Sequence, residues 1–416
     1  MSKIQKQSRC LNTIFGILLL TLFIGIGNTT KVFAEATAPT PLLSEGQAVD
    51  WWFVFKFNSK SFEGCGVRKC LFGGNVTDYG DRYSQQYVYA SSNNSKLQKG
   101  TGCAGDTLTD PIGATFNQVY NGDYFYVLWN DQFYDNPIKT KGAPWGHSKG
   151  MLAWDKNGNG FVMQVSTPSW AGSGSAKHPR QNDGNTLGCI KDDDVEVSQH
   201  FFSLKLTKKD LVDVLKAIIN ARVVTDTSKP QIFNNGGPED VQALAAKLGK
   251  IPETTSVTKV TLSSGVQLIS KPSNVQVPTW QLVSAQMNGV PLRAATWWAN
   301  PYIPSTTAST KIGCWVDGIG TPGAVDIATS GQWNGKVFGL KGGSGLDFNH
   351  AKIGVSTDAK SNYSIFGDMN QQGSIDPKTR KCSSSQNGRG GLFYVIQNED
   401  LTKSIAGLIK GSSAPE

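Results

Sequence analysis

The sequence has little charge, few histidines and almost no long apolar runs. Only 17% of its 416 residues are charged, which is below the roughly 25% that is typical of soluble domains. No apolar stretch beyond residues 14–26 approaches the ~20 residues of a membrane-spanning helix, which excludes a polytopic membrane protein. Its 11 Trp, 11 Tyr and 19 Phe exclude intrinsic disorder, and its 46 Gly indicate many turns and strands.

Acidic residues are missing from the first 34 positions. This segment has a basic start, an apolar stretch at 14–26 and Ala34 at its end, which predicts a cleaved signal peptide over residues 1–34. Without it, 36 basic and 32 acidic residues remain, so composition alone does not indicate a nucleic-acid binder. We expect a secreted or periplasmic protein, or a lysosomal one if the source is eukaryotic, with no stable membrane anchor after signal removal.

CxxC pairs are also missing. The six cysteines that remain without the leader are Cys65, Cys70, Cys103, Cys189, Cys314 and Cys382. An even number in an exported chain predicts structural disulfides, and the pairing stays open among ~15 possibilities. Zinc is disfavoured because only Cys65 and Cys70 are close neighbours.

Apolar patterning predicts strands in both halves of the chain, around a helical midsection. Helices are expected over residues 208–222 and 238–248. Strands are expected over residues 51–57, 124–129, 150–154, 160–165, 257–262, 266–269, 282–286, 353–356, 363–366 and 392–397. This order predicts an α/β fold with two lobes.

Two of the four histidines begin the same local pattern. His147 and His350 each start a His-x-Lys motif that is followed, after five further residues, by an aspartate. The lysines are Lys149 and Lys352, and each motif runs into an apolar, strand-like segment. The repetition predicts one site that is assembled from two related halves of the chain.

The spacing of these motifs suits the hydrolysis of a phosphodiester. Residues i and i+2 of an extended segment share a face, so each motif presents an imidazole beside an ammonium group. One histidine can attack phosphorus and form a phosphohistidine while the other protonates the leaving oxygen. The lysines neutralise the phosphoryl oxygens, so this chemistry needs no metal and no cofactor. An acid that must carry a proton predicts an acidic optimum.

Further blocks of sequence resemble one known family. The His-x-Lys pairs resemble those of the phospholipase D superfamily, and their surroundings resemble deoxyribonuclease II. The blocks that carry the second resemblance are GQAVDWW (46–52), NDQ (130–132), GHSKG (146–150), STP (166–168), GNTLGC (184–189), HAK (350–352), GDMN (367–370) and SQNGRGG (385–391).

This resemblance implies a metal-independent acid endodeoxyribonuclease that acts on DNA and leaves 3′-phosphate and 5′-hydroxyl ends. It implies two phospholipase D-like lobes (residues 35–235 and 236–416), each a mixed β-sheet flanked by helices, with the active site at their junction. A homodimer is also plausible in this family. The residues it assigns are His147, Lys149, His350, Lys352 and Asn370 as catalytic and Ser166 and Asp368 as substrate-binding. The superfamily favours His147 as the nucleophile and His350 as the acid.

The sequence departs from the family pattern at several positions in its second half, including those near which animal members carry cysteines, so their disulfide pattern cannot be transferred. Asn349 stands where an Asp usually precedes the histidine, and Gln371 stands where an Arg usually follows GDxN. Substrate preference is therefore open. The alternatives are a phospholipase D-type lipid phosphodiesterase, which an apolar lip around the site would indicate, and a non-hydrolytic DNA-binding or toxin-like protein on the same scaffold.

A few other residues could contribute to the site or serve the fold. His178 lies in a polar loop and could touch DNA phosphates, and His200 is expected to be partly buried. Trp297 and Trp298 could stack on bases, although packing in a core is the default for adjacent tryptophans. Glu399, just after the last expected strand, could orient a catalytic histidine through its free ring nitrogen.

Overall fold

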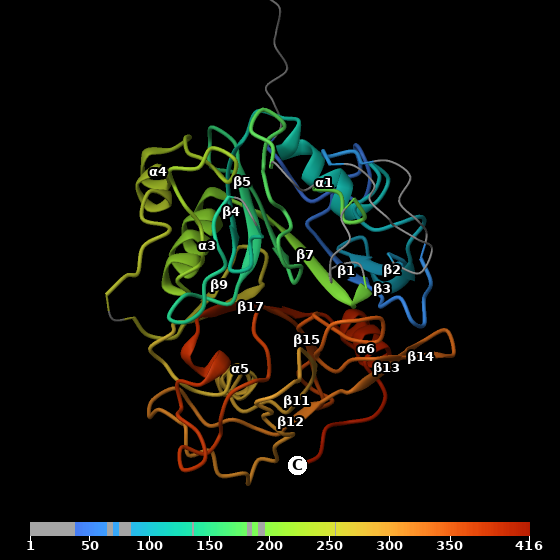
Figure 1. The fold of residues 1–416 in the computed structure, drawn as a ribbon, viewed down its shortest axis with the longest axis vertical. Helices are drawn as coiled ribbons and strands as arrows, with labels where there is room; N and C mark the ends of the chain where they lie inside the picture. Colours follow the sequence, from blue (N-terminus) through green and yellow to red (C-terminus); the bar gives the residue numbers. More distant parts are fainter. Residues whose placement is uncertain are drawn as a thin grey trace, which may run out of the picture. The chain divides into compact units, whose positions relative to one another are not determined.

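Two β-sheets, each built from one half of the chain, form the framework of the protein (Figure 1). The computed structural model describes residues 38–64, 70–74, 85–134, 137–180, 185–189, 196–253 and 255–416. The predicted signal peptide (1–34) and Cys65 lie outside the described residues.

The first sheet contains β1 (Trp51–Lys56), β2 (Tyr87–Ser91), β3 (Asn94–Lys99), β4 (Phe125–Asn130), β5 (Lys149–Trp154), β6 (Gly160–Val165), β7 (Gln199–Leu206) and β8 (Phe233–Asn234). The second contains β9 (Thr258–Thr261), β10 (Gln267–Lys271), β11 (Leu292–Ala295), β12 (Val325–Ile327), β15 (Ile353–Ser356), β16 (Tyr363–Gly367) and β17 (Gly391–Gln397). A separate hairpin pairs β13 (Ser330–Trp333) with β14 (Lys336–Gly339). The helices are α1 (Pro111–Tyr120), α3 (Lys208–Asn220), α4 (Glu239–Ala245), α5 (Thr279–Gln286), α6 (Glu399–Leu408) and the 3₁₀ helix η1 (Ser385–Gly388).

The two sheets repeat one strand order. Read from corresponding edges, the order is β8-β4-β5-β6-β7-β1-β2-β3 in the first sheet and β12-β11-β15-β16-β17-β10-β9 in the second. The strands β5-β6-β7-β1 therefore correspond to β15-β16-β17-β10. Helix α3 follows β7 as α6 follows β17, and α1 precedes β4 as α5 precedes β11. Every described pair is antiparallel except β11 with β12. This arrangement confirms the predicted α/β fold with two related lobes.

The sheets share one apolar core. Strand β1 is aromatic and β-branched on both faces, as expected of a strand that is covered on both sides. Phe53 and Phe202 of the first sheet stack on Phe366 of the second, with ring centroids 4.7 and 4.6 Å apart. Residues of α3 and α6 belong to this shared core, whereas α1 packs on the other face of the first sheet and α5 on the other face of the second.

Local sequence signals explain where the helices begin. Helix α3 confirms the helix predicted over 208–222, and its first turn is closed by a capping box between Thr207 and Asp210. Helix α4 is shorter than the predicted 238–248. The strand predicted over 282–286 is wrong, because these residues lie in α5. Nearly all of α5 is buried, so its short apolar run shows no helical period. Pro278, directly before the helix, is the one local feature of the sequence that indicates a helix start here.

The connection between the sheets runs from β8 through α4 to β9. It brackets the predicted lobe boundary at residues 235/236, but residues 38–416 form one compact unit, so two separate domains stay a prediction. None of the helices in the described ranges has the length and apolar character needed to span a bilayer.

Disulfides lie within each half of the chain. Cys70 pairs with Cys189 and Cys314 with Cys382, at Cα–Cα distances of 5.8 and 5.4 Å. Cys103 is also disulfide-bonded. The expected structural disulfides are therefore present, and the two described pairs each close a loop within one half.

Candidate active site

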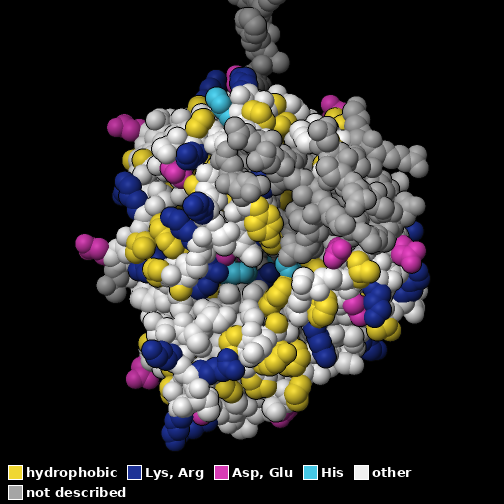
Figure 2. All heavy atoms as spheres, viewed as in Figure 1, with side chains coloured by type: hydrophobic (Ala, Val, Ile, Leu, Met, Phe, Trp, Pro, Cys, Tyr) yellow, Lys and Arg dark blue, Asp and Glu magenta, His cyan; other side chains and the backbone are white. Residues whose placement is uncertain are grey.

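A cavity of about 340 Å³ lies where residues from both sheets meet. Figure 2 shows histidine side chains (cyan) with basic side chains (dark blue) beside them near the middle of one face. The described residues that line the cavity are Asp131, Gln132, Thr140, Lys141, Gly142, His147, Trp297, His350, Lys352, Asn370, Gln372, Gln386 and Arg389. The lining therefore combines cations and amides from both halves of the chain.

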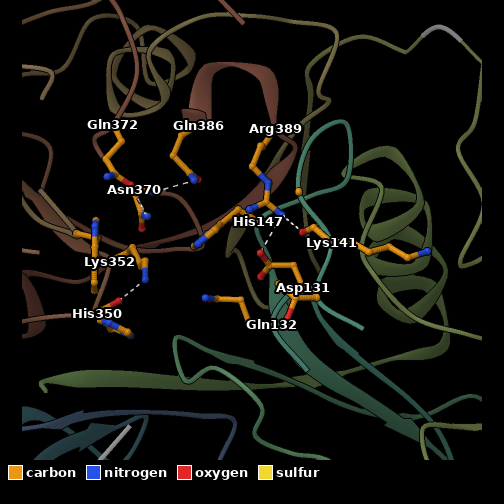
Figure 3. A pocket seen from close by; sticks show the side chains of 13 residues that line it. Asp131, Gln132, Lys141, His147, His350, Lys352, Asn370, Gln372, Gln386 and Arg389 are labelled. Atoms are coloured by element: carbon orange, nitrogen blue, oxygen red, sulfur yellow. Dashed lines mark hydrogen bonds and ion pairs between the residues drawn. The ribbon is translucent and has the colours of Figure 1, made fainter. Parts of the chain in front are cut away.

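His147 enters the cavity from the segment before β5 (Figure 3). Its backbone N–H donates to Gly390 O at 2.8 Å, and its Nδ1 lies 2.7 Å from Asp368 O. A carbonyl oxygen can only accept, so Nδ1 carries the hydrogen and Nε2 keeps its lone pair. Both carbonyls come from the second half of the chain. The contact thus fixes the tautomer in which the Nε2 lone pair is available.

His350 lies before β15, in the place equivalent to that of His147. Its backbone N–H donates to Ser198 O at 2.8 Å, so its segment is held by the first half of the chain. The ring of Trp297 meets the imidazole edge-on, with centroids 4.4 Å apart. His350 is therefore held through its backbone by the first half of the chain, and its ring packs against an indole of the second half.

The two motif lysines have different environments. Lys149 Nζ lies 2.7 Å from Asp131 Oδ1, and Arg389 Nη2 lies 2.8 Å from the other oxygen of the same carboxylate. These three groups form a buried ion network that joins the two halves of the chain. Lys352 Nζ instead donates to His350 O, and its backbone N–H donates to His200 Nδ1 at 3.1 Å. The duplicated site is therefore electrostatically asymmetric.

Burial and charge shift the titrating groups of the site. Burial, and next the nearby lysines, lower the pKa of both His147 and His350 well below the usual value of 6.5. Burial would raise the pKa of Asp131, but Lys149, His147 and Arg389 together hold it well below its usual range. Burial raises the pKa of Asp368 to about 7. At neutral pH these shifts favour the neutral form of both histidines and the ionised form of Asp131.

Comparison with known proteins agrees with this geometry. The family model for deoxyribonuclease II matches residues 40–414. The chain belongs to the deoxyribonuclease II family. It is similar to cell-death-related nuclease 7 of Caenorhabditis elegans, with 25% identity over 363 residues that cover 86% of this chain and 82% of the relative. It is also similar to deoxyribonuclease-2-alpha of Rattus norvegicus, with 28% identity over 153 residues that cover 35% of this chain and 39% of the relative.

The structure of this deoxyribonuclease II family member brings four of the seven expected site residues to the cavity: His147, His350, Lys352 and Asn370. Asn370 Nδ2 donates to Gln372 Oε1 at 2.9 Å, which orients its amide. Lys149 is not among the described residues that line the cavity, but it forms an ion pair with the lining residue Asp131.

Ser166 and Asp368 are not among the described residues that line the cavity. Ser166 Oγ donates to Gln199 Oε1 at 2.5 Å and accepts the backbone N–H of His200. The carboxylate of Asp368 accepts from Leu392 N–H at 3.0 Å, while its carbonyl holds His147. Asp368 thus supports His147 through its carbonyl. Ser166 holds the backbone of His200, whose ring accepts the backbone N–H of Lys352.

Sequence reasoning gave no role to Asp131 or Arg389, although both lie in blocks that resemble the family. Asp131 directly follows β4, and a carboxylate just after a buried strand is the feature of the sequence that could have marked it as a site residue. Glu399 does not reach the histidines, because it begins α6 on the surface and pairs with Lys403. His178 is exposed, whereas His200 is more deeply buried than expected, with none of its surface exposed.

Proposed function

We propose that this chain is an exported, metal-independent endodeoxyribonuclease that hydrolyses DNA through a phosphohistidine. The observation that carries the proposal is the meeting of both His-x-Lys motifs at one cavity, with the Nδ1 hydrogen of His147 held by a carbonyl so that Nε2 is the nucleophile. The disulfides support export. Cleavage of this kind has two steps.

In the first step His147 Nε2 forms a bond to phosphorus, and the P–O5′ bond breaks. His350 gives its proton to the departing 5′ oxygen, which leaves as a hydroxyl. In the second step His350 accepts a proton from water, the water oxygen bonds to phosphorus and the N–P bond breaks. The products are a 3′-phosphate and a 5′-hydroxyl. Lys352 and Arg389, which line the cavity, offset the charge on the phosphoryl oxygens, and Lys149 adds positive charge from behind Asp131. A divalent cation plays this role in other nucleases.

The lining of the cavity favours DNA over a lipid. Around the histidines lie Gln132, Gln372, Gln386, Lys141 and Arg389, which are polar or cationic. A lipid phosphodiesterase would need an apolar lip for acyl chains, whereas amides and cations suit a sugar-phosphate backbone. A homodimer stays a prediction.

Nicking of supercoiled plasmid in EDTA tests the proposed function. The wild-type chain is expected to cut at the same rate with and without the chelator, because lysines and Arg389 supply the positive charge. His147→Ala is expected to remove cutting under both conditions. Loss of wild-type activity in EDTA, or cutting that survives the substitution, would contradict the proposal.

The pH dependence of DNA cleavage follows from the buried histidines. His350 must carry a proton to act as the acid, and burial and the nearby lysines lower its pKa below 6.5. The rate is therefore expected to fall as pH rises, by about tenfold per pH unit once pH exceeds that pKa. Measuring kcat/KM from about pH 4 to about pH 9 checks this, and a flat profile over the histidine range would contradict it.

A further inference from the structure

Two buried lysines are not among the described residues that line the cavity. Lys56 is the last residue of β1 and Lys271 is the last residue of β10, and neither side chain is exposed to solvent. The two positions are equivalent in the repeated topology. Lys56 pairs with Gln199 of β7 in the first sheet, just as Lys271 pairs with Gly391 of β17 in the second.

Each ammonium group binds backbone carbonyls of the segment that leads into the neighbouring strand. Lys56 Nζ donates to Val197 O at 2.7 Å, two residues before β7. Lys271 Nζ donates to Arg389 O at 2.7 Å and to Asn387 O at 2.9 Å, just before β17. A buried ammonium group is costly to desolvate, so its presence at two equivalent positions calls for a function beyond packing.

The next carbonyl along each of these segments holds a catalytic histidine from the other half of the chain. Ser198 O, one residue after Val197 O, accepts the backbone N–H of His350 at 2.8 Å. Gly390 O, one residue after Arg389 O, accepts the backbone N–H of His147, also at 2.8 Å. Successive carbonyls of an extended segment point to opposite sides, so one faces the lysine and the next faces the histidine.

We propose that Lys56 and Lys271 are positioning residues, each of which aligns the catalytic histidine of the opposite half by fixing the peptide next to that histidine's backbone acceptor. Lys271 thus acts on the nucleophile His147, and Lys56 acts on the acid His350. The assignment of these two effects rests on the proposed function. The same contact at Arg389 O also fixes the residue whose guanidinium group binds Asp131.

The two lysines are distinguished by a substrate that needs no acid. Thymidine 3′-(4-nitrophenyl phosphate) still requires attack on phosphorus, but its leaving group departs without a proton. Misalignment of the nucleophile by an ångström can cost about 100-fold in rate. Lys271→Met is therefore expected to lower kcat by about 10- to 100-fold on both DNA and the aryl ester, with KM within about threefold. Lys56→Met is expected to lower kcat on DNA by a similar factor. On the aryl ester it is expected to leave the rate of the nitrophenol burst, which reports the first step alone, within about threefold, because only the second step on that substrate needs His350.

The matched control is Ser270→Ala in the same strand as Lys271. Ser270 Oγ donates to Ala217 O at 2.8 Å, so this variant loses a buried hydrogen bond that does not touch the segment before β17. It is expected to melt at a lower temperature with unchanged kcat. Lys271→Gln and Lys56→Gln keep an N–H donor on a shorter side chain, and an intermediate kcat is expected for each.

The possible results separate this proposal from the proposed function. Failure of the wild-type chain to cut DNA, or activity in His147→Ala, rejects the proposed function. If both behave as expected but the Met variants keep wild-type kcat, only the role of the lysines is wrong. A loss of the nitrophenol burst rate in Lys56→Met equal to its loss of kcat on DNA would also contradict its assignment to the acid. If the Met and Gln variants of one lysine all fail to fold, that lysine serves the fold rather than the alignment, and the proposal is wrong for it.

Discussion

His350→Ala is expected to slow DNA cleavage by about 10²- to 10⁴-fold and to leave the first step on a nitrophenyl ester nearly intact. The reason is that His350 supplies a proton that nitrophenolate does not need. Without its base, however, the second step is slow, so a thymidylate adduct is expected to accumulate on His147. A burst of nitrophenol equal to the enzyme concentration, with the adduct identified by mass spectrometry, measures both effects.

His147→Ala is the counterpart and is expected to remove activity on both substrates, by at least ~10⁴-fold, because no bond to phosphorus can form. No adduct is expected in this variant. Melting curves of both variants show whether the loss reflects folding. An adduct on His350, or an aryl ester activity that depends on His350 rather than His147, would reverse the roles assigned from the Nδ1 contact with Asp368 O.

Asp131→Asn is expected to have the largest effect on stability. Asp131 binds both Lys149 and Arg389, and its side chain is 1% exposed, so the substitution leaves two cations without their counter-charge. Breaking a buried ion pair typically costs about 3–5 kcal/mol of unfolding free energy. Urea unfolding of the wild-type and variant chains at neutral pH measures the loss.

The pH dependence of this loss has a definite sign. The folded-state pKa of Asp131 lies below its unfolded value, so its ionisation contributes stability that is present above the unfolded pKa and lost as pH falls through the folded pKa. The difference between wild type and Asp131→Asn is therefore expected to persist at about pH 5, where carboxylates of ordinary pKa are still ionised. Asp123→Asn is the control, because Asp123 pairs with Lys177 on the surface, and no measurable change is expected. Disappearance of the Asp131 effect at that pH would contradict the assigned shift.

The residues to which we assign the chemistry could be singled out from the sequence alone, because their pattern is repeated. Two histidines in one pattern, each leading into an apolar strand, indicated a shared site, and the structure brings His147 and His350 to one cavity. The strands of the first half could also be predicted from the sequence, since runs such as that of β1 are rich in aromatic and β-branched residues.

The supporting contacts could not be predicted in this way. Asp131 and Arg389 come from distant parts of the chain, and no local pattern marks a pair that forms only when the two sheets dock. Lys56 and Lys271 each end an apolar run, where a lysine ordinarily marks a solvent-exposed strand end. Helix α5 was missed because burial on nearly all sides removes the periodicity by which a helix is recognised.

The exchange of backbone contacts between the halves has one more consequence. The N–H of His147 finds its acceptor at Gly390 and that of His350 at Ser198, so each half of the polypeptide supplies the backbone acceptor for the histidine of the other half. A chain cut between α4 and β9 yields two fragments that each keep an intact motif, yet each fragment lacks the acceptor for its own motif. Neither fragment is therefore expected to cut DNA by itself, whereas the reassociated pair of fragments is expected to do so.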